Sequence, residues 1–365
     1  MAGGRLKRVA ILTGGGDCPG LNAVIRAFVK TANAVYDWEV VGIADGFEGL
    51  LRTDGCCELS SENVRGLLPR GGTILGTSNR GDPFNHKVLV DGAVRVVDRS
   101  GEAVARLEEL GIDALVVGGG DGSLSIGLRF QQLGVPVVGV PKTIDNDLSA
   151  TDLTFGFDTA VATATEAIDK LHSTAESHHR VMLLEVMGRH AGWIALEAGL
   201  AGGCDVILIP EIPFRVERVI AHVEERDARG RNFSIVVVAE GACPVGGIPM
   251  TVESKDPLAP RRLGGIGNWL AEQLAHHTTH EVRVTVLGHL QRGGSPTPCD
   301  RVLATRFGCA AAHLVGQREF GKMVALRGQH VVPVTLEEAV GALKTVPPTC
   351  EKVLTARHMG MSFGD

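Results

Sequence analysis

Short apolar runs alternate with amphipathic segments along almost the whole chain. The apolar runs predict buried strands at residues 9–12, 39–44, 114–117, 135–140, 181–185, 206–210, 233–239 and 282–287. The segments between them predict helices at residues 19–35, 102–110, 124–133, 158–176, 264–277 and 300–316. Pro19 suits the first turn of its helix, where a missing N–H costs nothing. Because strand and helix alternate, the pattern predicts an α/β fold with parallel sheets and right-handed crossovers.

The length of the chain indicates two domains. A chain of 365 residues is long for one hydrophobic core, and an apolar content of 44% is enough to fill two. The segment 143–157 is a plausible first crossing between them. The stretch 244–262 is rich in Pro and Gly and predicts a long exposed loop.

Charge and cysteine usage narrow the possible partners and the cell compartment. A formal net charge of −6 provides no basic surface, so a nucleic-acid partner is not expected. The eight cysteines have no CxxC spacing, and Cys56 and Cys57 are adjacent, which favours reduced thiols over a disulfide framework. Residues 1–8 lack the features of a signal peptide, and no apolar stretch is long enough to span a membrane. We therefore expect a cytoplasmic protein without a membrane partner.

Two glycine-rich turns each follow a predicted strand and open a predicted helix. The first is residues 13–20 and the second is residues 118–123. Such turns let backbone N–H groups and a helix N-terminus approach a phosphate. Asp121 in the second turn could hold Mg²⁺ between two phosphates. The alternatives are a tight turn without a ligand for the first, and a helix-capping role of Asp121 for the second.

A pair of carboxylates lies at the carboxyl end of the predicted strand 135–140. Asp145 and Asp147 follow Lys142 and Thr143 in the segment PKTIDND. Ligands of open α/β sheets bind at this edge, so one carboxylate could take a proton from a hydroxyl group. Asp-Asn-Asp also favours an ordinary Asx-turn, although that reading leaves Lys142 and Thr143 unexplained.

Basic residues follow two later predicted strands. Arg189 lies just past residues 181–185, and His289 and Arg292 share the loop after residues 282–287. Arginine binds phosphate through two hydrogen bonds and stabilises a transferring phosphoryl group. A single such arginine is usually a solvated surface residue, but several past strand ends favour a phosphate site.

The motifs taken together resemble the signature blocks of the 6-phosphofructokinase family. The matching blocks are Gly15-Gly16-Asp17, residues 119–123, residues 141–147, Met187-Gly188-Arg189 and residues 288–296. They occur in the family's order and cover the chain from about residue 8 to residue 325. The resemblance implies transfer of a phosphoryl group from ATP, with Mg²⁺, to the 1-hydroxyl of fructose 6-phosphate in glycolysis.

The family resemblance also implies an architecture of two Rossmann-like three-layer domains with mostly parallel sheets. The larger, nucleotide-binding domain would comprise residues 1–145 plus about 290–325. The smaller domain, which binds fructose 6-phosphate, would comprise about 146–289 plus the C-terminal segment.

The resemblance also implies roles for individual residues, assigned by matching positions of this chain to the family's motifs. The nucleotide would be held by Gly16, Arg80, Gly81, Gly120, Asp121, Gly122 and Ser123, with Asp121 on Mg²⁺. Asp145 would be the general base, with Thr143 and Arg189 also catalytic. The sugar phosphate or the transferred group would contact Thr143, Met187, Gly188, Arg189, Glu240, His289 and Arg292. Arg180 and Arg283 match positions that reach a neighbouring subunit's site, which implies a homotetramer or a dimer.

The phosphoryl donor depends on two positions. Gly122 resembles the ATP users of the family, whereas an aspartate there marks pyrophosphate users. Lys142 resembles the pyrophosphate users, so the chain is similar to the mixed-substrate branch. A small residue leaves space for the α-phosphate, while a carboxylate would fill that space and repel it. ATP is therefore the favoured donor, and pyrophosphate is the alternative.

Two other functions fit parts of the sequence. A nucleotide sensor without activity would need the turns alone, but the acids and arginines are intact. A lipid kinase also uses a Gly-Gly-Asp-Gly turn, but it does not account for the blocks after residue 180.

Overall fold

The computed structural model describes residues 6–90, 93–252 and 262–365, and these form two compact units. Unit 1 comprises Met1–Ile144, Leu148–Asp158 and Arg292–Leu343, as far as these are described. Unit 2 comprises Asp145–Asp147, Thr159–Gln291 and Lys344–Asp365, again as far as described. The larger predicted domain ended near residue 325, whereas unit 1 continues to Leu343.

Unit 1 is built on a seven-stranded sheet with the order β15-β14-β7-β6-β1-β2-β3. Its strands are β1 (Arg8–Thr13), β2 (Glu39–Ile43), β3 (Cys56–Leu59), β6 (Ala114–Gly119), β7 (Val137–Pro141), β14 (Lys322–Arg327) and β15 (His330–Thr335). The five inner strands run parallel, while the edge strands β3 and β15 pair antiparallel. Every residue of β6 and β7 is buried, as expected where helices cover both faces.

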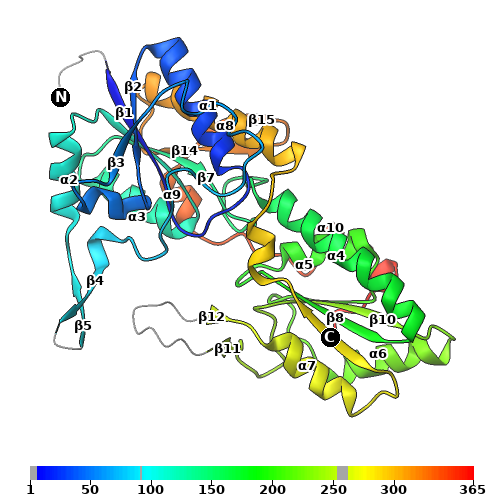
Figure 1. Cartoon of the computed structure of the whole chain (residues 1–365). Coiled ribbons are helices and arrows are strands. Elements are labelled where there is room, and N and C mark those ends of the chain that lie inside the picture. The colour runs from blue at the N-terminus through cyan, green and yellow to red at the C-terminus, as the bar shows by residue number, and fades with distance from the viewer. Residues whose placement is uncertain (1–5, 91–92, 253–261) are drawn as a thin grey trace. The chain divides into compact units, whose positions relative to one another are not determined.

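The helices of unit 1 cover both faces of this sheet. They are α1 (Leu21–Thr31), α2 (Ser100–Glu109), α3 (Asp121–Gln132), α8 (Pro298–Gly316) and α9 (Leu336–Val340). Helix α1 packs against α8 and α3 packs against α9, on opposite faces (Figure 1). The π-helical segment η1 (Ala32–Tyr36), which continues α1, the 3₁₀ helices η2 (Gly46–Leu51) and η3 (Pro83–Asn85), and the hairpin β4 (His86–Val90)–β5 (Ala93–Val97) are the unit's other described elements.

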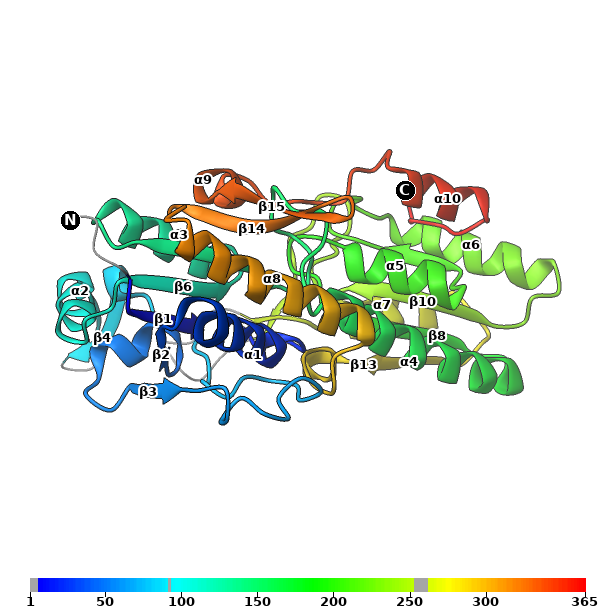
Figure 2. The same ribbon diagram turned by 90° about the horizontal axis from the view of Figure 1, so that it is seen from above.

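Unit 2 is a smaller layered α/β unit. Its four parallel strands, in the order β13-β8-β10-β9, are β13 (Val282–Val286), β8 (Val181–Val186), β10 (Ser234–Ala239) and β9 (Val206–Leu208). Its helices are α4 (Phe157–His178), α5 (Trp193–Gly202), α6 (Val216–Ala228), α7 (Ile266–Ala275) and α10 (Glu351–His358). Helix α5 packs on α10, and α6 packs on α7 at the other face of the sheet (Figure 2). The short ribbon β11 (Thr251–Val252)–β12 (Arg262–Leu263) and the turn η4 (Gly288–Arg292) complete its described elements.

The predicted α/β fold class is confirmed, and each predicted strand lies within a few residues of an observed one. The placement of Pro19 in a helix is wrong, because α1 begins at Leu21. Gly20 has φ of 108°, and a side chain there would come within 2.7 Å of the Phe155 ring. This left-handed glycine forces a sharp turn between Pro19 and the helix.

Other expectations concern segments outside the core. The loop predicted at 244–262 is partly the ribbon β11–β12, and its residues 253–261, like residues 1–5 at the N-terminus, lie outside the described residues. All eight cysteines are free thiols. Among the helices of the described residues, none combines the length and apolar character needed to cross a membrane.

Candidate active site

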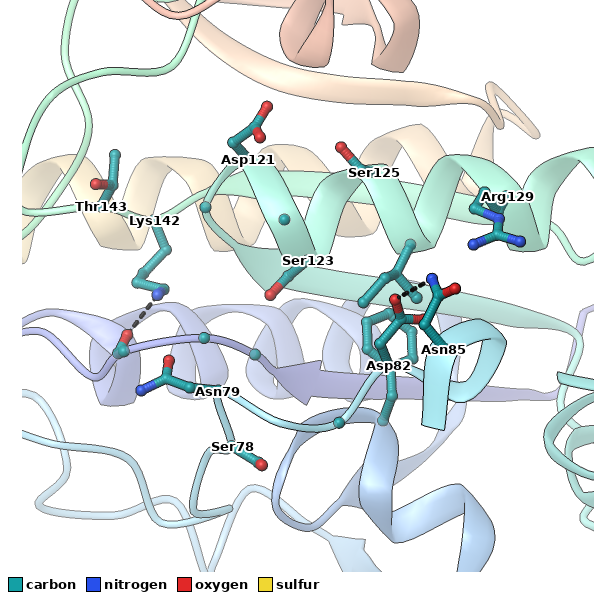
Figure 3. A pocket seen from close by; sticks show the side chains of 18 of the residues that line it. Ser78, Asn79, Asp82, Asn85, Asp121, Ser123, Ser125, Arg129, Lys142 and Thr143 are labelled. Carbon is teal, nitrogen blue, oxygen red and sulfur yellow. Dashed lines mark hydrogen bonds between the residues drawn. The ribbon is translucent and has the colours of Figure 1, made fainter. Parts of the chain in front are cut away.

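A cavity of about 630 Å³ lies in unit 1, where the strand order of its sheet reverses. Chain order runs outward from β1 to β2 on one side and from β6 to β7 on the other. The loops after β1 and β6 therefore part at the carboxyl edge, where open α/β sheets bind ligands. The cavity is lined by Gly14, Gly15, Gly16, Phe47, Ser78, Asn79, Gly81, Asp82, Asn85, Gly120, Asp121, Gly122, Ser123, Ser125, Ile126, Arg129, Lys142, Thr143 and Arg292 (Figure 3). Its volume suits a small-molecule ligand.

The first glycine-rich turn is braced by hydrogen bonds of its own backbone. Gly14 N donates to Gly118 O at 2.9 Å, and Gly15 N donates to Ser78 O at 3.2 Å. The Thr77 hydroxyl donates to Gly15 O at 2.6 Å. Two N–H groups of this turn are thus already engaged within the protein. The sequence suggested a row of backbone N–H groups available to a ligand. Instead, the turn mainly shapes the cavity wall, because its glycines have no side chains and a ligand can approach the backbone closely.

The second turn leads directly into α3, whose N-terminus opens on the cavity. Gly120 is the N-cap residue, and Asp121 is the first helical residue. The capping alternative for Asp121 therefore does not hold, because the cap position belongs to a residue without a side chain. A helix N-terminus favours negative charge, so the turn suits a phosphate.

Gly122 faces open space. A Cβ atom at this position would meet no atom within 4 Å, and the residue lines the cavity. Gly119 differs, because a side chain there would come within 2.3 Å of Ser123 Cβ. A larger residue at position 122 would therefore extend into the ligand space without disturbing the protein around it.

Lys142 connects the two glycine-rich turns. Its backbone N donates to Gly119 O at 2.9 Å, and its ammonium donates to Gly16 O. The ammonium also lies 3.3 Å from the place of a Cβ atom on Gly15 (Figure 3). Only 3% of the residue is exposed, so the cavity carries a buried positive charge at its glycine-lined wall.

The predicted nucleotide residues are found at the cavity with one exception. Gly16, Gly81 and the run from Gly120 to Ser123 line it. Arg80 is exposed and does not line it, although its chain neighbours Asn79 and Gly81 do. Two residues assigned to the sugar phosphate, Thr143 and Arg292, line the same cavity.

Arg292 is held over the first turn. Its Nη1 atom donates to Asp17 O at 3.1 Å and lies 2.6 Å from the place of a Cβ atom on Gly16. A guanidinium at this position adds a second positive charge beside the glycine backbone. The cavity therefore brings together Lys142, Arg292 and the amino end of α3, a combination that suits a phosphate.

Sequence reasoning missed part of the cavity wall. Ser125 and Arg129 line it together with Asp121, and the three are spaced four residues apart on α3. Such spacing places side chains on one helix face, so this signal was available in the sequence. The Arg129 guanidinium lies 3.8 Å from the centre of the Phe84 ring, which fixes it at the cavity rim. Ser78, Asn79 and Asp82 come from the segment before η3 and Asn85 from η3 itself, and no periodicity marked them.

Asp121 is the candidate magnesium ligand of the cavity. Within residues 6–90, 93–252 and 262–365, no group of three or more His, Cys, Asp or Glu side chains could hold a metal ion. Magnesium in phosphoryl-transfer sites is commonly held by one or two carboxylates plus the substrate's phosphates. A single carboxylate beside a phosphate-binding turn fits that mode of binding.

In unit 2, three neighbouring strands bring predicted substrate residues to one edge. Met187, Gly188 and Arg189 follow β8, Glu240 follows β10, and His289 follows β13. Glu240 N donates to Val186 O at 2.8 Å and Gly241 N donates to Gly188 O at 3.1 Å, which joins the first two loops. Arg189 and His289 are exposed, so their side chains are accessible to a ligand.

Gln291 is a buried residue that supports this edge, and the sequence did not predict this role. It is fully buried, its Oε1 atom accepts from Met187 N at 2.7 Å, and its Nε2 atom donates to Ala160 O at 3.5 Å. The residue lies within the block 288–296 singled out in the sequence, but nothing there marked it as buried.

Arg180 and Arg283 lie at the opposite end of the same sheet. Arg180 directly precedes β8, and Arg283 is the second residue of β13. Both guanidiniums bond to Glu281, and the hydrogen bond from Arg180 holds the pKa of that carboxyl below its usual value. The six residues of β8 separate this end from Met187 by about 20 Å. The two arginines therefore cannot join the edge formed by Arg189 and Glu240 of the same chain.

The acidic segment is divided between the units. Thr143 lines the unit 1 cavity, whereas Asp145, Asn146 and Asp147 belong to unit 2. Asn146 has a left-handed backbone with φ of 50°, in line with the turn-forming character of the Asp-Asn-Asp sequence. Lys344 N donates to Asp147 O at 2.8 Å and fixes the end of this turn.

Comparisons with known proteins agree with this geometry. A phosphofructokinase family model matches residues 8–315. An ATP-dependent 6-phosphofructokinase of Chloroflexus aurantiacus is 57% identical over 98% of both chains. A pyrophosphate–fructose 6-phosphate 1-phosphotransferase of Amycolatopsis methanolica is 54% identical over 93% of this chain and 96% of its own.

A solved structure gives the same assignment. The phosphofructokinase of Pichia pastoris in the T-state is 33% identical with a TM-score of 0.79, and the match covers 92% of this chain and 35% of that one. The chain thus spans about a third of that yeast protein and nearly the full length of its curated relatives. On the family match, the full-length identities and the shared fold, this chain belongs to the phosphofructokinase family.

Proposed function

We infer that the chain is an ATP-dependent 6-phosphofructokinase, a glycolytic kinase. It transfers the γ-phosphoryl group of ATP to the 1-hydroxyl of fructose 6-phosphate and produces fructose 1,6-bisphosphate. The observation that carries this function is the open space at Gly122 in a cavity of about 630 Å³, in a chain 57% identical to an ATP-dependent relative. ATP has an α-phosphate that pyrophosphate lacks, and the open space beside Gly122 leaves room for it.

Unit 1 supplies the nucleotide site. The phosphates lie against Gly16, Gly120, Gly122 and Ser123, next to the positive charges of Lys142 and Arg292. Gly81 and Arg80 complete the predicted set, although Arg80 does not line the cavity. Asp121 would hold Mg²⁺, which would supply positive charge beside the phosphates.

The base and most residues of the proposed sugar-phosphate site belong to unit 2, whereas Thr143 and Arg292 belong to unit 1. Asp145 accepts the proton of the 1-hydroxyl while that oxygen forms a bond to the γ-phosphorus and ADP departs. Thr143 and Arg189 bind the transferring group and stabilise its charge. The remaining contacts to fructose 6-phosphate are assigned to Met187, Gly188, Glu240, His289 and Arg292. The larger unit thus binds the nucleotide, and most of the residues assigned to the acceptor lie in the smaller one.

A homo-oligomer completes the site. Arg180 and Arg283 lie at the far end of the unit 2 sheet from Arg189, too distant to serve a site of their own chain. We assign them to the sugar-phosphate site of a neighbouring subunit in a dimer or tetramer, acting in the cytoplasm. Their shared partner Glu281 holds both guanidiniums ready for a phosphate.

Pyrophosphate remains the second candidate donor, because Lys142 places a buried ammonium in the cavity and a relative at 54% identity uses pyrophosphate. A donor-competition assay tests the assignment. Fructose 6-phosphate is incubated with equal concentrations of ATP and pyrophosphate at fixed Mg²⁺, and ADP and phosphate are measured. The proposed function expects ADP formation to exceed pyrophosphate consumption by at least about tenfold. Consumption of pyrophosphate without formation of ADP in this assay would overturn the donor assignment.

A further inference from the structure

The loop that carries Asp145 is held by the C-terminal segment 344–365, which contains none of the predicted site residues. Lys344 makes two bonds to this loop. Its ammonium donates to Asn146 Oδ1 at 2.8 Å, and its backbone N donates to Asp147 O at 2.8 Å. One residue of this segment therefore binds both positions that follow Asp145. All of these residues belong to unit 2.

The other side of this contact is anchored to the start of α5. Trp193 Nε1 donates to Lys344 O at 2.9 Å. Val346 N donates to Glu211 Oε1 at 2.7 Å, and the same carboxylate accepts from Gly192 N at 3.0 Å. Burial raises the pKa of Glu211, whose role is to join backbone groups rather than to meet solvent. Residues 344–346 thus connect the Asp145 loop to the helix that follows the Arg189 loop.

Asn146 needs such support because of its backbone. Its φ of 50° is a left-handed conformation, and only 3% of the residue is exposed. Non-glycine residues in that region cost about 1 kcal/mol and persist where their surroundings fix them. The Lys344 ammonium bonds the side chain of Asn146, a residue that is buried and has a left-handed backbone. A charge-assisted bond of this kind is stronger than a neutral one.

We propose that Lys344 is a positioning residue for phosphoryl transfer, which holds Asp145 in place through Asn146 and Asp147. The inference rests on the role of Asp145 as the base under the proposed function. A base must lie within about 0.5 Å of its working position, and a shift of about 1 Å can cost about 10²-fold in rate. The Lys344 side chain bonds Asn146 in the loop and lies in unit 2, so its loss should change kcat while leaving ATP binding in unit 1 intact.

The test compares Lys344→Met with Lys352→Met. Lys352 lies in the same C-terminal segment, pairs with Glu197 on α5 and stands 5.8 Å from the Trp193 ring. Its replacement loosens the same segment without touching residues 145–147. We expect Lys344→Met to lower kcat by about 10- to 100-fold with KM for ATP within about twofold, and Lys352→Met to keep wild-type kcat. Equal kcat values for the two variants would overturn the inference.

A second variant keeps the test decisive if Lys344→Met fails to fold. Asn146→Gly retains the left-handed backbone, which glycine adopts freely, and removes the acceptor of the lysine ammonium. We expect the same fall in kcat. In the double variant the loss should match the larger single loss, because both changes break one contact. Losses that multiply would contradict the proposal.

Asp145→Asn separates this inference from the proposed function. If Asp145→Asn keeps wild-type kcat, the base assignment fails and the inference falls with it. If Asp145→Asn is inactive while Lys344→Met and Asn146→Gly have wild-type kcat, the proposed function stands and only the positioning role is refuted.

Discussion

Gly122→Asp provides the sharpest test of donor choice. Gly122 lines the unit 1 cavity, and no atom lies within 4 Å of a Cβ atom built there. The new carboxylate therefore enters the ligand space instead of displacing protein atoms. Position 122 is also in the first turn of α3, where a negative side chain is favourable by about 0.3–1 kcal/mol. We expect the variant to fold with an unchanged or slightly raised melting temperature.

The expected loss in kcat/KM for ATP follows from the repulsion between this carboxylate and the negatively charged α-phosphate. Two like charges about 4 Å apart repel by about 4 kcal/mol at an effective dielectric constant of about 20. Since about 1.4 kcal/mol corresponds to a factor of ten, kcat/KM for ATP should fall by about 10³-fold. The volume of the side chain, which takes the room of the α-phosphate, adds to this loss.

The assay is the steady-state rate of ADP formation at saturating fructose 6-phosphate, with melting temperatures measured in parallel. Gly122→Ala adds volume without charge and should stay within about threefold of wild type, whereas Gly122→Asn separates size from charge. The reasoning is refuted if Gly122→Asp keeps kcat/KM for ATP within about tenfold of wild type. It is also refuted if Gly122→Ala loses as much as Gly122→Asp.

Three further outcomes are expected. Asp145→Asn should lower kcat by about 10²- to 10⁴-fold with KM for ATP nearly unchanged, as steady-state kinetics would reveal, because a base acts in the transition state. If sites are shared between subunits, Arg180→Ala and Arg283→Ala should each be poorly active alone. Co-expression of either variant with Asp145→Asn should restore about a quarter of wild-type activity, because about a quarter of the sites then combine an intact arginine with an intact Asp145. Co-expressed mixtures as inactive as the single variants would exclude shared sites. Burial raises the pKa of Cys18 to about 12, so about one thiol in 10⁴ is ionised at pH 8. Peptide mass spectrometry after iodoacetamide treatment should find the exposed Cys57 alkylated and Cys18 intact until the protein unfolds.

Local patterns were sufficient to predict the secondary-structure elements and the glycine-rich turns that line the cavity. The strand at 114–117 and the helix at 124–133 were predicted because apolar spacing reports which faces are buried. The glycines of residues 118–123 indicated a phosphate turn because a ligand can approach backbone closely only where side chains are absent. The face of α3 formed by Asp121, Ser125 and Arg129 could have been found by the same reasoning.

Contacts between distant segments could not be predicted in this way. Strand β14 joins unit 1 by pairing Lys322 and Met323 with β7, a register that no local period encodes. Pro19 was misplaced because Gly20 has a left-handed backbone, at a place where a side chain would meet the Phe155 ring, far along the chain.

The sequence by itself determined the α/β class, the order of the elements and the residue types that chemistry requires at the strand ends. Only the tertiary structure decided which of those residues meet. It brought Lys142 and Arg292 to the glycine turns, placed Asp145 in unit 2 with Lys344, and put Arg180 at the far end of the sheet. The reason is physical: periodicity is set by neighbours within a few residues, whereas a site depends on packing between segments far apart in the chain.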